Sequence, residues 1–117
     1  MNSNKPYSRV ERVEKQILDI LSNILLKNIS LTELGFVTFT HVKMAPDLRS
    51  AKVFYSVLNP MFTYEKINIE INKRQKAFKK YMSPQLSLKS TPIIKFYHDE
   101  RFIYSEKIDK LFKEKKI

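Results

Sequence analysis

The chain has 117 residues, of which 43% are hydrophobic and 29% are charged, proportions typical of a single globular domain with one modest core. It contains no cysteine, which excludes a disulfide framework, a cysteine-ligated zinc site and a thiol nucleophile, and favours a cytoplasmic location. Its 22 Lys and Arg residues against 12 Asp and Glu give a net charge of +10. This excess favours a polyanionic partner, nucleic acid first and an anionic membrane surface second, over a protein that is merely basic.

The N-terminal stretch MNSNKPYSRVERVEKQ lacks the apolar core of a signal peptide, and no apolar run in the chain is long enough to span a bilayer. We expect residues 1–8 to form a flexible N-terminus that leads into a helix over residues 8–28. Ser8 and Glu11 have the spacing of a capping box at the start of that helix. The helix is indicated by an apolar stripe at helical spacing, made of Val10, Val13, Ile17, Leu21, Ile24 and Leu25.

The most strand-like part of the chain is residues 36–58, which are rich in Val, Phe, Tyr and Thr. A turn signal, APDL at residues 45–48, divides it and predicts a β-hairpin with one face toward a core. Gly35 is the only glycine of the chain and stands directly before the first strand. We expect it to occupy a position that needs a positive φ or a close approach of the backbone.

The first strand of this hairpin carries an irregular apolar pattern. Val37 and Phe39 alternate with polar residues, but the next apolar residues, Val42 and Met44, have the opposite phase. A β-bulge near residues 40–41 would restore the phase, and a twisted strand with two apolar faces is the alternative.

A second helical stretch follows Thr63, which is expected to be its N-cap. Apolar residues keep helical spacing through this stretch, at Ile67, Ile71, Phe78 and Met82. Ser83-Pro84 then breaks the helix or begins a new turn. A third strand is predicted over residues 92–98, and the residues after it indicate a short amphipathic helix at best.

The outward side of the second helical stretch carries five cations within eight residues and no acid among them. They are Lys73, Arg74, Lys76, Lys79 and Lys80. A solvated helix face usually mixes charges of both signs, because like charges this close repel. The cluster therefore favours phosphate binding over a face that is merely solvated.

The predicted order is helix, strand, strand, helix, short helix, strand, without an internal repeat or a linker. An α+β domain with a three-stranded sheet and helices packed on one of its faces is the compact solution for this order. We expect Phe39, Tyr55, Phe78 and Phe96 to lie in its core.

The αββααβ order is the type II KH-like arrangement, and the hairpin sequence resembles the signature of the ribosome-binding factor A family. In that signature a glycine precedes a V-T-x-T-x-V strand, which is followed by a Pro-Asp-Leu turn and an Ala-Lys-Val strand. The matching residues are Gly35, Val37, Thr38, Thr40, Val42, Pro46, Asp47, Leu48, Ala51, Lys52 and Val53. The likeness extends over residues 9–108, which we take as the domain, and leaves residues 109–117 as a basic C-terminal tail.

The resemblance implies a non-catalytic, monomeric and cytoplasmic factor that binds the free small (30S) ribosomal subunit and supports its late maturation and 16S rRNA processing. No cofactor is implied, and cooperation with an assembly GTPase is left open. The chain departs from KH modules because, with Gly35 as its one glycine, it has no GXXG loop. Arg74-Gln75-Lys76, which are good helix formers, replace the Ala-x-Gly kink of the family. The position of the break is therefore open between this site and Ser83-Pro84.

The sequence offers no constellation for catalysis or metal binding. His41 and His98, the only histidines, fall in predicted strands without further ligands at suitable spacing. Asp99 and Glu100 are adjacent acids without the burial that would separate their pKa values. An enzyme is therefore disfavoured, and neither a metal nor a cofactor is expected.

RNA binding is expected mainly from the five cations of residues 73–80, since phosphates dominate such affinities. Second contributors are Arg9, Arg12, Lys43, Arg49 and Lys52. Tyr81 and Tyr97 are candidates for stacking on bases, and the hairpin is expected to be a scaffold and not the main binding surface. An integral ribosomal protein or an RNA-binding translation regulator is the alternative function. A protein of the membrane surface is disfavoured, because the helices lack Trp and mostly mix charges.

Overall fold

The computed structural model describes residues 8–101, and these follow the predicted αββααβ order. The hairpin strands are β1 (Phe36–Met44) and β2 (Ser50–Leu58), and the last strand is β3 (Ile93–His98). The helices are α1 (Arg9–Lys27), α2 (Tyr64–Asn72) and α3 (Gln75–Met82), with short 3-10 turns η2 (Thr32–Leu34) and η3 (Ser83–Gln85). Of the flexible N-terminus predicted over residues 1–8, Ser8 is the N-cap of α1, and residues 1–7 lie outside the described residues. The segment from residue 102 onward, with the basic tail predicted over 109–117, also lies outside them.

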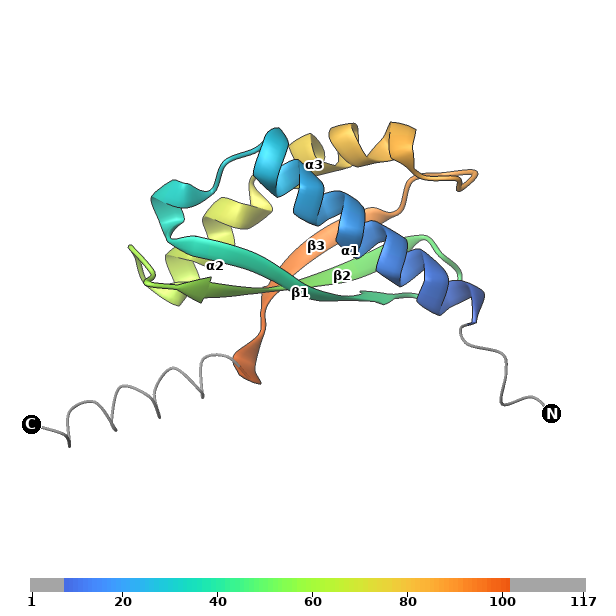
Figure 1. Ribbon diagram of the computed structural model, residues 1–117. Helices are drawn as coiled ribbons and strands as arrows, with labels where there is room; N and C mark the ends of the chain where they lie inside the picture. Colours follow the sequence, from blue (N-terminus) through green and yellow to red (C-terminus); the bar gives the residue numbers. More distant parts are fainter. Residues whose placement is uncertain (1–7, 102–117) are drawn as a thin grey trace, which may run out of the picture.

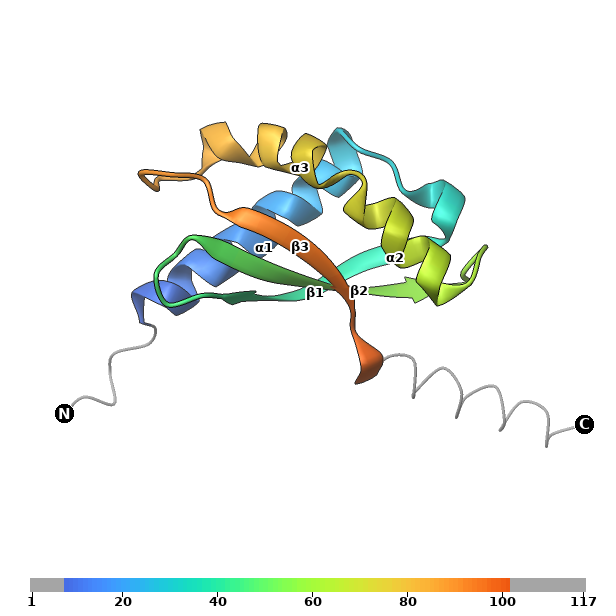
Figure 2. The same cartoon turned by 180° about the vertical axis from the view of Figure 1, so that it is seen from behind.

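The three strands form one sheet in the order β1-β2-β3, with β1 antiparallel to β2 and β2 parallel to β3. The three α-helices cover one face of this sheet (Figures 1 and 2). Within residues 8–99, no helix lies on the opposite face. The predicted α+β fold with helices on a single face is thereby confirmed. None of the described helices combines the length and the apolar character that crossing a membrane requires.

The start of α1 has the predicted capping box. Ser8 Oγ accepts from the backbone N–H of Glu11 at 3.1 Å, and the Glu11 carboxylate accepts from the backbone N–H of Ser8 at 3.2 Å. The helix then buries one stripe against the sheet, made of Val13, Ile17, Ile20, Leu21 and Ile24. Glu14 also joins helix to sheet, because its carboxylate accepts from the backbone N–H of Met44 at 2.7 Å.

The predicted β-bulge is present in β1. The pairing with β2 shifts between Phe39 and His41, so that Phe39 pairs with Tyr55 and His41 pairs with Phe54. As a result Phe39 and Val42 are both buried although their spacing breaks the alternation. The alternative of a strand with two apolar faces is therefore wrong.

Gly35 meets both conditions expected of it. Its φ of 132° lies in a region that side chains with a Cβ rarely adopt. A Cβ at this position would lie 2.8 Å from Val57 Cγ1 and 2.9 Å from the carbonyl oxygen of Asn59. The end of the hairpin therefore packs directly on the glycine backbone.

The second helical stretch is interrupted at Lys73 and Arg74, between α2 and α3. The break thus occurs where the chain has good helix formers, and Ser83-Pro84 only begins the turn η3 after α3 has ended. Asn72 explains this position. Its side-chain amide donates to the carbonyl of Phe96 at 2.9 Å and accepts from the N–H of Phe96 at 2.9 Å, which ties the end of α2 to the outer edge of β3.

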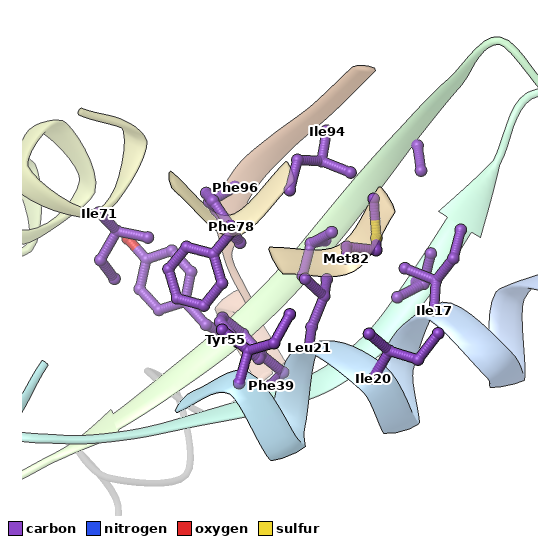
Figure 3. Close-up of a cluster of buried hydrophobic side chains, with 14 of the residues drawn as sticks. Ile17, Ile20, Leu21, Phe39, Tyr55, Ile71, Phe78, Met82, Ile94 and Phe96 are labelled. Carbon is purple, nitrogen blue, oxygen red and sulfur yellow. The ribbon is translucent and has the colours of Figure 1, made fainter. Parts of the chain in front are cut away.

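The core lies between the sheet and the helices, and Figure 3 shows its central side chains. Phe39, Phe78 and Phe96 are buried, as predicted, and their rings form a cluster with centroid distances of 5.3–5.6 Å. Tyr55 is fully buried in the same layer, and its hydroxyl donates to Asn68 at 2.8 Å. Burial raises the pKa of this phenol, which therefore stays protonated as a donor.

Candidate nucleic-acid interface

The five cations predicted as the main RNA-binding cluster divide into two groups. Lys76, Lys79 and Lys80 lie on α3, and none of them takes part in an ion pair within residues 8–101. Lys76 and Lys79 line a shallow groove that also contains Ile93 and Ile94 of β3. This groove joins a positively charged helix to the edge of the sheet, which suits an extended polyanion.

Lys73 and Arg74 are compensated by acids that lie outside the run of five. Lys73 Nζ lies 3.1 Å from Glu70, and Arg74 forms ion pairs with Glu70 and with Glu33 of η2. The hydrogen bond from Lys73 lowers the pKa of Glu70, against the opposing effect of desolvation. The sequence-based view of five uncompensated charges is therefore wrong for these two residues.

Arg74 also supports the break between the helices. Its guanidinium donates to the backbone carbonyl of Glu70 at 2.6 Å, which satisfies a group at the C-terminal end of α2. The side chain is only 27% exposed. Through these contacts with Glu70 and Glu33, Arg74 joins α2 to η2.

The predicted second contributors are separated by the fold. Arg9 and Arg12 are exposed on the first turn of α1, and Arg49 is exposed beside the hairpin turn. Arg9 and Arg49 line one shallow groove together with Lys89 from the loop before β3. Lys89 was not predicted, because it stands in a loop without a periodic pattern.

Lys43 and Lys52, the other second contributors, lie on the sheet face that the helices leave open. Lys43 pairs with Lys52 in the β1–β2 register, and Lys52 pairs with Lys95 in the β2–β3 register. The three exposed lysines therefore form one row across the sheet, called the lysine row below. Lys95 was missed, although its alternation with the core residues Ile94 and Phe96 could have revealed it.

The two stacking candidates lie on different surfaces. Tyr81 is 42% exposed on α3 and does not line the groove that contains Lys76 and Lys79. Tyr97 is half-buried on the open sheet face, and the ammonium groups of Lys52 and Lys95 lie 5.6 and 5.7 Å from its ring centroid. Both residues remain predictions as stacking partners.

The expectation that Asp99 lacks burial is wrong, because its carboxylate is buried at the end of the sheet beside this face. Asp99 is 3% exposed, and it accepts from Thr40 Oγ1 at 2.9 Å and from the Arg101 guanidinium at 2.7 Å. The hydrogen bonds from Arg101 and Thr40 hold the pKa of Asp99 well below its usual range and outweigh the opposing effect of burial. Within residues 8–101, no group of three or more His, Asp and Glu side chains could hold a metal ion.

Comparison with known proteins concerns the family and the fold of the chain. The family model described as "Ribosome-binding factor A" matches residues 9–112. Ribosome-binding factor A of Geobacter metallireducens is 32% identical over 108 residues, which cover 92% of each chain. The crystal structure of ribosome-binding factor A from Thermus thermophilus superposes with a TM-score of 0.66, at 13% identity and over 79% of this chain and 97% of that chain. A Thermus thermophilus model fitted into the cryo-EM map of a 30S complex has a TM-score of 0.59, at 13% identity and over 74% and 90% of the two chains.

Proposed function

The chain belongs to the ribosome-binding factor A family, and on this basis we propose that it is a non-catalytic assembly factor that binds the free 30S ribosomal subunit. It supports the late maturation of that subunit and the processing of 16S rRNA in the cytoplasm. It acts as a monomer without a cofactor, and an assembly GTPase is a candidate partner. The family match over residues 9–112 is the observation that carries this proposal. The Thermus thermophilus relative, which was fitted into the map of a 30S complex, supports the choice of subunit.

The charge distribution supports rRNA as the surface that is bound. Lys76, Lys79 and Lys80 extend from one helix without acidic partners in the described part of the chain. Each lysine that contacts a phosphate releases condensed counterions, so that binding weakens as the salt concentration rises. Lys73 and Arg74 are expected to contribute less, because their charges are already paired with Glu70 and Glu33.

The first prediction tests this role of α3. Replacing Lys76, Lys79 and Lys80 by Gln should weaken binding to purified 30S subunits and reduce the salt dependence by about one unit of log–log slope per lost contact. Binding is measured by co-sedimentation or by fluorescence anisotropy at several salt concentrations.

A matched control removes the same charge elsewhere, by Gln replacements of the exposed Lys15, Lys27 and Lys66. This control should keep the slope of the wild type. An unchanged slope in the α3 variant would remove these lysines from the interface.

Sedimentation of cell lysates separates the proposed factor from an integral ribosomal protein. The factor is expected with free 30S subunits and absent from translating ribosomes. Its presence in both fractions, at one copy per small subunit, would favour the integral protein.

A further inference from the structure

The sheet face opposite the helices carries two adjacent rows of side chains that together resemble a binding surface. In the register of the sheet, His41 pairs with Phe54 and Phe54 pairs with Tyr97, which places three rings in one row across all three strands. The lysine row, formed by Lys43, Lys52 and Lys95, is two residues further along the same strands. Two residues of strand separate the rows by about 7 Å.

The rings of the first row contact one another. His41 and Phe54 stack with a centroid distance of 4.2 Å and an interplanar angle of 4°, and Phe54 and Tyr97 lie 5.8 Å apart. An open hollow adjoins this row, lined by the three rings together with Asp99, Glu100 and Arg101. The hollow therefore has an aromatic wall with a guanidinium at its border.

Within the described residues, no acidic side chain pairs with the lysine row, although Lys52 and Lys95 lie 5.6 and 5.7 Å from the ring centroid of Tyr97. Like charges directly opposite one another on neighbouring strands destabilise a sheet. The three strands contain no acidic residue that could offset this repulsion. A row of three cations beside a row of rings is complementary to a ligand that carries both negative charges and flat bases.

We propose that this open sheet face binds an unpaired segment of single-stranded RNA. A base lies against the rings of Phe54 and Tyr97 in the hollow, and the neighbouring phosphates contact the lysine row. Open sheets with aromatic side chains bind single-stranded RNA in this manner in other modules, because unpaired bases stack on exposed rings. The inference rests on the proposed function and deepens it, since it names the form of RNA that the protein recognises.

The surface is distinct from the α3 groove. Its cations come from β1, β2 and β3, whereas the groove cations come from α3, on the side of the sheet that the helices cover (Figures 1 and 2). The hairpin is then part of a binding surface, in contrast to the scaffold role that the sequence predicts.

The second prediction concerns the rings. Phe54→Leu and Tyr97→Leu should each weaken binding of the full chain to a fluorescein-labelled single-stranded RNA octamer about tenfold, because each removes a stacking platform. Tyr97→Phe retains the ring and should bind as the wild type does. Phe62→Leu removes a ring that is 43% exposed in the loop before α2 and is the matched control, with no expected change.

The same octamer and variants define the outcomes that overturn the inference. The inference is overturned if Phe54→Leu and Tyr97→Leu bind the octamer as tightly as the wild type does. It is also overturned if the wild type binds a duplex of the same sequence as tightly as the single strand. Competition by vesicles of anionic phospholipid that depends on Phe54 and Tyr97 would assign the face to a membrane. If a Leu variant fails to fold, NMR of the wild type decides, since RNA should shift the ring resonances of Phe54 and Tyr97.

NMR of the wild type also tests whether the chain covers the face itself. Contacts from residues 102–117 to these rings that persist when RNA is added would overturn the inference.

Parallel assays with 30S subunits separate the two proposals. If the ring variants bind the octamer normally while the α3 variant loses 30S binding, the inference is contradicted and the proposed function is not. If the wild type binds the octamer through these rings but does not associate with 30S subunits, the proposed function is contradicted and the binding of RNA by the sheet face is not.

Discussion

At the scale of single residues, a few residues fix the geometry of the sheet through contacts with partners that are distant in the sequence. Gly35 allows the hairpin end to close on its backbone. Thr40, displaced by the bulge, reaches Asp99 at the end of β3. The backbone N–H of Asp99 also donates to the carbonyl of Tyr55 at 2.7 Å, so this residue extends the contact between β2 and β3.

The third prediction is that Gly35→Ala lowers the free energy of unfolding by about 2 kcal/mol or more, because it adds backbone strain and a steric contact. The clash with the Asn59 carbonyl is the severe one, since backbone cannot move aside as the Val57 side chain can. Urea unfolding measures the change. Thr38→Ala, at an exposed position of β1, is the control and should change stability by about 0.5 kcal/mol or less. A stable Gly35→Ala variant would contradict the close packing described at this position.

The fourth prediction is a pH dependence that comes from Asp99. Its pKa is lower in the folded protein than in the unfolded chain, so the unfolded chain binds the proton first as the pH falls. The stabilisation is therefore complete above the unfolded pKa of about 4 and is lost progressively below it. Asp99→Asn should lower the unfolding free energy by about 1.5–3 kcal/mol at pH 7, because charged hydrogen bonds are lost.

This difference between the wild type and Asp99→Asn should shrink as the pH falls from about 5 to about 2. Urea unfolding over that range measures it. Asp19→Asn, at an exposed position of α1, is the matched control. A difference that stays constant with pH would show that the carboxylate charge has no part in the stabilisation.

At the scale of elements, the interruption between α2 and α3 orients the basic helix against β3. Asn72 ends α2, and its amide occupies hydrogen-bonding groups at the free edge of β3. Gln75, the first residue of α3, donates to the same Asn72 oxygen at 2.7 Å. One side chain thus joins both helices to the strand that borders the α3 groove. The same contacts protect an edge that could otherwise pair with another chain.

The fifth prediction is that Asn72→Ala lowers the unfolding free energy by about 1–3 kcal/mol, because two backbone groups of Phe96 lose their partners. Amide exchange at Phe96, measured by NMR, should become faster. Asn23→Ala removes an exposed amide of α1; it should leave the exchange at Phe96 unchanged and should not lower the unfolding free energy, because Ala favours the helix over Asn. If Phe96 exchanged at the wild-type rate in Asn72→Ala, the amide would not be what holds the edge.

At the scale of the whole molecule, the packing of all three helices on one face of the sheet creates two separate basic surfaces, one beside α3 and one on the uncovered face of the sheet. The α3 groove lies between α3 and the edge of β3, and the lysine row lies on the open sheet face. Both are cationic, which agrees with the net charge of +10. If each surface binds a different part of the rRNA, the variants of one surface should not alter the contacts of the other.

The local elements followed from the sequence, because their causes are local. The capping box at Ser8 depends on residues within one helical turn, and the bulge after Phe39 is visible as a change of phase in the alternation of apolar side chains. The position of Gly35 directly before the first strand also indicated its role, although the groups that pack on it, Val57 and Asn59, are distant in the sequence. The hairpin motif also indicated the family, which the match over residues 9–112 confirms. The core aromatics were predictable for the same reason, since their periodicity assigns them to one face.

Glu70 lies three and four residues before Lys73 and Arg74, so its pairs with them are local. Only the tertiary structure decided that Glu33 also compensates Arg74 and where the helix breaks. Glu33 lies 41 positions from Arg74 in the sequence, and Asn72 lies 24 positions from Phe96. The lysine row likewise exists only because β3 pairs with β2 in one particular register. Composition determined that the chain is strongly basic, whereas strand register and side-chain pairing determined where that charge can meet a partner, because both depend on contacts between residues that are distant in the sequence.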